Sequence, residues 1–168
     1  MADPVVAAPL ISQLDPCELP DGGELDELVL SEALVERHGR DALTDSRLVG
    51  FSLSEGRVED LRVAGGTMML SSFAHSTLRR VAFENVNLRE ASFLETQLEF
   101  VHFDGCDLTG ADFRGARLKE CAIRGSSLDG VLGVESLRGL TMPWGDLVGS
   151  VGALAAALGI GVEGAEGE

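Results

Sequence analysis

The side chains of this chain that could hold a metal ion or act as nucleophiles are three histidines and three cysteines: His38, His75, His102, Cys17, Cys106 and Cys121. Metal sites and nucleophilic sites need such residues at short, defined spacings, as in HExxH or CxxC. Neither spacing occurs, and the glycine-rich stretches AGGTMM and DGG lack the Gly-Lys-Ser/Thr ending of a phosphate-binding loop. The sequence therefore predicts no catalytic residue, no metal, no cofactor and no enzyme activity.

A period of five runs through the middle of the chain and determines where these residues lie. Seventeen consecutive fifth residues are apolar: Leu48, Leu53, Val58, Val63, Met68, Phe73, Leu78, Phe83, Leu88, Phe93, Leu98, Phe103, Leu108, Phe113, Leu118, Ile123 and Leu128. A helix repeats every 3.6 residues and a strand every two, so neither produces this spacing. A chain that turns a corner every five residues does. The sequence therefore predicts a solenoid in which each coil packs on its neighbours.

The five-residue blocks VNLRE, ASFLE, CDLTG, ADFRG and ARLKE resemble the repeats of the pentapeptide-repeat family, in which a small and a polar residue precede Leu or Phe. The resemblance covers residues 48–128. It implies an all-β solenoid, the right-handed quadrilateral β-helix, here with about 4–5 coils and a C-terminal α-helical cap. Some members of the family are DNA mimics that bind a type II topoisomerase such as DNA gyrase and protect it from quinolones. The resemblance therefore brings that function into consideration.

Four blocks per coil place the inward residues in four columns. Two columns are rich in phenylalanine, Phe73, Phe93 and Phe113 in one and Phe83 and Phe103 in the other. An interior filled in this way is expected to be close-packed, without room for a ligand cavity. Cys106 and Cys121 occupy the small inward position and are expected to be buried thiols. His102 points outward beside Asp104 and is expected to be a solvated surface histidine.

The composition divides the chain into five parts. Residues 1–24 are an N-terminal extension, partly flexible or docked along the rod, and residues 25–44 are an irregular first coil or an N-terminal cap. Residues 45–131 form the β-helix. Residues 132–162 form the C-terminal cap, and residues 163–168 a disordered tail.

The cap is predicted to contain a helix over about 142–158, with Thr141 as its N-cap residue. Apolar residues recur at helical spacing on one face: Leu147, Val151, Leu154 and Leu158. Trp144 is expected to pack against the last coil. One interpretation is that this helix only closes the end of the solenoid; the other adds a homodimer through the cap, because Ala153 and Ala155–Ala157 make the opposite face small and apolar.

Four outward positions of the coils are also apolar, namely Met69, Leu70, Leu94 and Phe100. They lie either beneath the N-terminal segment or in a patch that binds a protein partner, since large exposed apolar patches are uncommon in monomers.

The net charge of −15 indicates an acidic protein that avoids direct contact with nucleic acid. Residues 45–130 hold thirteen acids and ten bases, so most of the excess lies at the two ends. No export signal, membrane span or disulfide pattern is evident, which favours the cytoplasm.

The favoured function is a rigid protein–protein interaction module with an unidentified partner. The alternative is a DNA mimic that modulates gyrase; the nearly neutral coils count against it.

Overall fold

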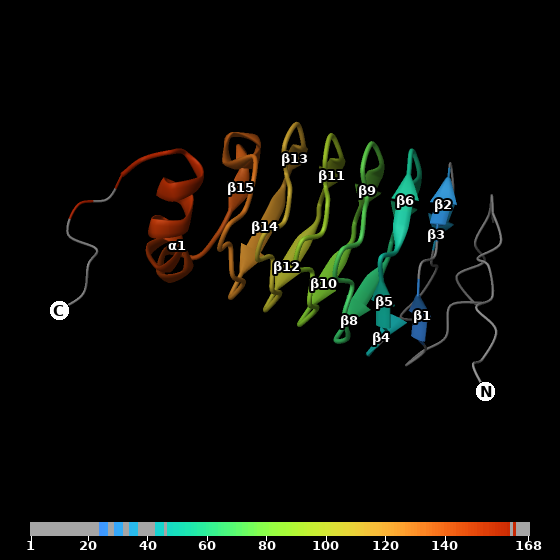
Figure 1. Ribbon diagram of the computed structural model, residues 1–168. Coiled ribbons are helices and arrows are strands. Elements are labelled where there is room, and N and C mark those ends of the chain that lie inside the picture. Colours follow the sequence, from blue (N-terminus) through green and yellow to red (C-terminus); the bar gives the residue numbers. More distant parts are fainter. Residues whose placement is uncertain are drawn as a thin grey trace.

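The computed structural model describes residues 24–26, 29–31, 34–36, 43–45, 47–161 and 163. Within them the chain winds into stacked coils of short parallel strands, and a helix lies across the end of the stack beyond the last strand (Figure 1). Residues 1–23, the first predicted part of the chain, and most of residues 162–168 lie outside the described residues.

The strands form four parallel ladders along the stack. The six-stranded sheet contains β4 (Leu43–Thr44), β8 (Arg62–Ala64), β10 (Ala82–Glu84), β12 (His102–Asp104), β14 (Cys121–Arg124) and β15 (Leu140–Thr141). The five-stranded sheet contains β3 (Leu34–Glu36), β7 (Arg57–Glu59), β9 (Thr77–Arg79), β11 (Gln97–Glu99) and β13 (Arg117–Lys119). The other two ladders begin with β1 (Glu24–Asp26) on β5 (Arg47–Val49) and β2 (Val29–Ser31) on β6 (Ser52–Ser54), and isolated bridges continue them.

The register repeats every twenty residues, which is four blocks of five. Phe83 pairs with Phe103 and Leu78 with Leu98, so each core residue lies directly above its equivalent in the previous coil. The prediction of a β-solenoid with a C-terminal helix is therefore confirmed.

The first coil differs from the rest by three extra residues. Leu25 pairs with Leu48 and Val35 with Val58, both 23 residues apart, whereas Leu43 pairs with Val63 at the regular interval of twenty. The additional residues therefore fall between β3 and β4. The backbone of the described parts of residues 25–44 follows the coil path, and the insertion explains why the five-residue period breaks upstream of Leu43.

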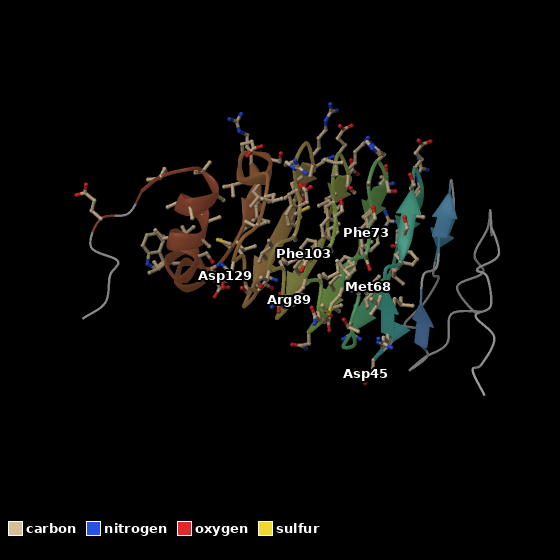
Figure 2. All side chains as sticks on the ribbon, in the orientation of Figure 1. Asp45, Met68, Phe73, Arg89, Phe103 and Asp129 are labelled. Atoms are coloured by element: carbon tan, nitrogen blue, oxygen red, sulfur yellow. The ribbon has the colours of Figure 1, made fainter. Side chains whose placement is uncertain are left out.

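The interior of the coils is filled with stacked side chains (Figure 2). The ring of Phe93 stacks on Phe73 and Phe113, with centroids 5.3 and 4.9 Å apart, and meets Phe103 edge to face at 5.6 Å. All the repeat core positions except Leu118 are at most 4% exposed. Leu118 is half-buried, because the one-turn 3-10 helix η2 (Val134–Leu137) rather than a strand follows it in the stack.

The cap consists of η2, β15 and the helix α1 (Trp144–Ala157). Thr141 belongs to β15, so its predicted role as the N-cap residue is wrong; Pro143 takes that position without a side-chain hydrogen bond. The helix is instead tied to the last coil by Asp146, whose carboxylate accepts a hydrogen bond from the Gly125 N–H at 2.6 Å. Ser136 accepts the Gly115 N–H in the same manner at 3.0 Å. These two side chains accept hydrogen bonds from backbone N–H groups at coil corners. In the other coils, the equivalent N–H groups donate to a backbone carbonyl of the next coil.

Candidate interaction surfaces

The small inward position of a repeat makes a hydrogen bond wherever Ser, Thr or Cys occupies it. Its side chain donates to the carbonyl of the core residue 23 positions earlier, as Thr96 does to Phe73 at 2.7 Å and Ser76 to Leu53 at 3.0 Å. The thiols of Cys106 and Cys121 make the same contact, at 3.3 Å each, with Phe83 and Leu98. Both cysteines are free and buried. They are structural thiols rather than candidate nucleophiles.

Burial raises the pKa of the Cys106 thiol to about 11, above the 9.0 of an ordinary thiol. We expect native Cys106 to resist Ellman's reagent at pH 8 and to react fully in urea, as measured in a Cys17→Ser, Cys121→Ser background. The thiol is protonated in both states below pH 9, so its contribution to stability is complete there and is lost as pH rises toward 11. In Cys106→Ser, which keeps the hydrogen bond, this loss between pH 9 and pH 11 should vanish; an unchanged loss would contradict the assignment.

The two described histidines, His75 and His102, do not form a site with one another. His75 lies at a coil corner, with its Nδ1 3.3 Å from Glu95 Oε2. His102 is half-buried rather than fully solvated, and its Nδ1 is buried without a hydrogen-bond partner among the described residues. Within the part of the chain that the structure describes, no group of three histidine, cysteine or acidic side chains could hold a metal ion. His38 and Cys17 lie outside the described residues.

Ion pairs, most of them between adjacent coils, engage many of the described arginines. Arg79 lies 3.7 Å from Glu99, Arg89 lies 3.3 Å from Asp107, and Arg80 binds Asp60 with two hydrogen bonds. Further pairs join Arg62 to Glu84, Arg114 to Asp112 and Arg124 to Asp104. The hydrogen bond from Arg62 lowers the pKa of the Glu84 carboxyl, although partial burial opposes this. The paired faces therefore carry little free charge.

Four exposed cations have no carboxylate partner among the described residues: Arg57, Arg117, Lys119 and Arg138. Arg57 lies on β7, near the start of the rod. The other three lie together at its C-terminal end, on β13 and immediately after η2. This cluster was not apparent from the sequence, because a cation in one coil forms its ion pair with a carboxylate about twenty residues away in the next coil.

The four outward apolar residues of the coils do not form one patch. Leu70 is 55% exposed at a coil corner, with Met69 half-buried beside it. Leu94 is half-buried on the next face, one coil further along. Phe100 lies two corners away from the corner column of Leu70, which places it on the opposite edge of the four-sided coil. The structure therefore separates Phe100 from the other three.

The predicted apolar face of α1 divides into two parts. Leu147 and Leu154 are half-buried toward the last coil, and Leu154 packs against the core. Val151 and Leu158 are 52% and 53% exposed. Trp144 is 77% exposed, so the expectation that it packs against the last coil is wrong. No residue of the helix is fully buried.

An apolar groove of about 560 Å³, here called the C-terminal groove, separates α1 from the last coil. Its walls are formed by the core end of the coil, the segment after η2, and the inward face of α1: Leu128, Val134, Glu135, Leu137, Arg138, Leu140, Thr141, Met142, Leu147 and Leu154. Among the described helices, none has the length and apolar character needed to cross a membrane.

Comparison with known proteins identifies the repeat. Residues 67–132 match the family model of the pentapeptide repeat region. No curated protein matches the sequence. Among solved structures, the fold is similar to the pentapeptide repeat protein Rfr23 of the cyanobacterium Cyanothece 51142, with a TM-score of 0.56 and 14% identity, covering 73% of this chain and 89% of that one.

Two further solved structures match at lower TM-scores. HetL of the cyanobacterium Nostoc sp. strain PCC 7120, a pentapeptide repeat protein involved in heterocyst differentiation regulation, gives a TM-score of 0.47 at 18% identity, covering 73% of this chain and 62% of HetL. QnrB1, a plasmid-mediated fluoroquinolone resistance protein, gives 0.29 at 15% identity, covering 90% of this chain and 95% of QnrB1.

Proposed function

Because the chain carries a pentapeptide repeat region folded as a β-solenoid, we propose that it acts as a rigid, non-enzymatic protein–protein interaction module in the cytoplasm. The filled interior supports this proposal, since the coils leave a ligand only the outer surface of the rod. Their charged side chains are largely committed to ion pairs between coils, which stabilise a surface rather than activate a substrate.

The observation that carries the proposal is the clustering of exposed apolar side chains at one end. Of the seven exposed large apolar residues in the described part of the chain, six lie between residues 132 and 160: Leu132, Trp144, Val148, Val151, Leu158 and Ile160. Single exposed apolar residues are common, but several on one end of a protein, three of them here on α1, are typical of an interaction surface. The C-terminal cap is therefore the most favourable part of the described surface for association.

Part of this surface pairs with a second copy of the chain. Asp146 is the single charged residue of α1, and it is already bonded to Gly125. A helix that is apolar on all sides is normally buried, yet no residue of α1 is fully buried and its outward face is exposed. A two-fold pairing of the outward faces would cover Trp144, Val148 and Val151 on both copies at once.

We expect Val151→Glu to convert the dimer to a monomer in sedimentation equilibrium at tens of micromolar protein, because it would bury two carboxylates at a two-fold interface. Leu70→Glu is the matched control: Leu70 has nearly the same exposure, 55% against 52%, but lies in the coils. That variant should remain dimeric, and both variants should keep the wild-type circular dichroism. Equal sedimentation of the wild type and Val151→Glu would contradict the pairing.

The alternative function is DNA mimicry directed at a type II topoisomerase, and the net charge of −15 is the observation in its favour. The deciding experiment titrates the protein into purified gyrase during supercoiling, with and without a fluoroquinolone. Inhibition of gyrase, or its protection from the drug, that grows with protein concentration and disappears in high salt would support DNA mimicry over the interaction module. Absence of any effect, together with a protein captured by the wild type that rebinds after purification, would support the module. Failure of both assays would contradict both functions.

A further inference from the structure

The C-terminal groove has walls of two different kinds. Its apolar wall contains Leu137, Leu140 and Met142 from the segment that precedes α1, together with the half-buried inward face of the helix. Arg138 forms part of its rim and is exposed. The groove is therefore apolar inside and cationic at one edge.

The cationic edge extends onto β13. Gly139, the residue after Arg138, lies against this strand, because a Cβ added there would be 3.3 Å from the carbonyl oxygen of Leu118, the neighbour of Lys119. Arg117 lies on the same strand and, two residues before Lys119, on the same side of it. All three side chains are exposed, and none has a carboxylate partner among the described residues.

The neighbouring acids do not neutralise this edge. Glu99 is paired with Arg79 at 3.7 Å. Glu135, which also lines the groove, adds to the raised pKa of Arg114, whose main partner is Asp112. Glu120 and Glu135 form no ion pair in the described part of the chain, so three free cations face two free acids. An arrangement of this kind favours an anionic ligand.

The net negative charge of the whole chain does not cancel the preference of the groove for an anionic ligand. The acids of the first coil whose backbone the structure describes, Glu24, Asp26 and Glu36, lie on β1 and β3, at the opposite end of the rod from the groove. About five coil spacings of ~4.8 Å separate the ends, which exceeds the screening length of about 8 Å at physiological salt. The field at the groove is therefore set mainly by nearby residues.

We propose that the C-terminal groove binds an acidic amphipathic peptide segment of a protein partner. An apolar side chain of that segment seats against Leu140 and Met142, and its carboxylates meet Arg138, Lys119 and Arg117. The cationic edge selects this ligand over a second copy, because the outward face of α1 offers no carboxylate. This inference rests on the proposed interaction function and gives that function a partner class.

The test uses a fluorescein-labelled peptide, acetyl-EELFEELFEE-amide, and the full chain, with binding followed by fluorescence anisotropy. A second peptide with Gln in place of every Glu is the charge control. The acidic peptide should bind at least about tenfold more tightly than the Gln peptide, and the difference should shrink in high salt. Equal affinity for the two peptides would overturn the proposal.

Variants of the protein then locate the site. Arg138→Glu and Lys119→Glu should each weaken binding of the acidic peptide at least about fivefold. Arg57→Glu is the matched control, because Arg57 is also exposed and has no carboxylate partner among the described residues, but it lies on β7 of the same sheet, away from the groove. Met142→Glu should weaken binding through the apolar wall. Equal losses in Arg57→Glu and Arg138→Glu would overturn the assignment to the groove.

Two controls distinguish peptide binding in the groove from the proposed dimer and from the general interaction function. Each variant is first shown to keep the wild-type circular dichroism and sedimentation, so that neither unfolding nor loss of the dimer explains weaker binding. The captured partner of the preceding subsection is then tested against Arg138→Glu. Loss of the partner supports the groove as its site, whereas full retention overturns the groove and leaves the interaction module standing. Failure of the wild type to capture any partner counts against the module itself.

Discussion

Replacing Phe93 by Ala is expected to lower the free energy of unfolding by about 3–5 kcal/mol, the usual cost of removing a buried phenylalanine ring. Phe93 is fully buried, and its ring stacks on Phe73 and Phe113 and meets Phe103 edge to face. The substitution therefore removes three ring contacts, each worth about 0.5–1.5 kcal/mol in favourable geometry. Few neighbours can fill the space, because stacked coils have a fixed separation.

The position of Phe93 in the middle of the stack adds a second effect. A solenoid is stabilised by contacts between adjacent coils, so a defect in a central coil weakens the coupling between its two halves. In urea unfolding followed by circular dichroism, Phe93→Ala should show both a lower midpoint and a shallower slope than the wild type. Phe93→Leu, which keeps most of the volume, should show a smaller loss. A loss below about 1 kcal/mol for Phe93→Ala would contradict the packing argument.

The five-residue period was sufficient to predict the core because one large side chain points into the coil once in every five residues. Each core residue from Leu48 to Leu128 occupies an equivalent position, and the twenty-residue register follows from four corners per coil. Leu118 is the exception in burial because η2, not a strand, lies next to it in the stack. The sequence does not mark that change, since residue 118 itself fits the repeat.

The ends were harder to predict because the period stops there. The three-residue insertion between β3 and β4 shifts the register, which hides a coil that the backbone nevertheless forms. At the other end, helical spacing identified α1, but spacing alone does not fix which face turns inward. Leu147 and Leu154 turn toward the coil, whereas Trp144 faces solvent. The three free cations beside the groove depend on pairing between coils, which a linear pattern does not contain.

The C-terminal cap depends on the backbone conformation of Gly133, immediately before η2. Its φ is +76°, and a side chain there would bring a Cβ within 2.4 Å of the Arg114 nitrogen and 2.7 Å of the Phe113 carbonyl carbon. Both contacts are with backbone atoms, which cannot rotate away. The preceding Leu132 accepts the Phe113 N–H and donates to Ala111, each at 2.9 Å. A displaced Gly133 would therefore break the last regular contacts between the coils and the cap.

We expect Gly133→Ala to destabilise the cap by about 2–6 kcal/mol, the sum of a left-handed strain of about 1–3 and an overpacking cost of similar size. Gly149→Ala is the matched control, because Gly149 lies inside α1 with nothing within 4 Å of the added Cβ. That change should stabilise the helix by about 0.5–1 kcal/mol, since Ala is the better helix former. Hydrogen exchange of the Phe113 and Leu132 amides should accelerate in Gly133→Ala and stay at the wild-type rate in Gly149→Ala. Opposite effects of these two alanine substitutions on stability would show that the backbone geometry before η2 holds the end of the solenoid closed. Helix propensity in α1 would then not be the main cause.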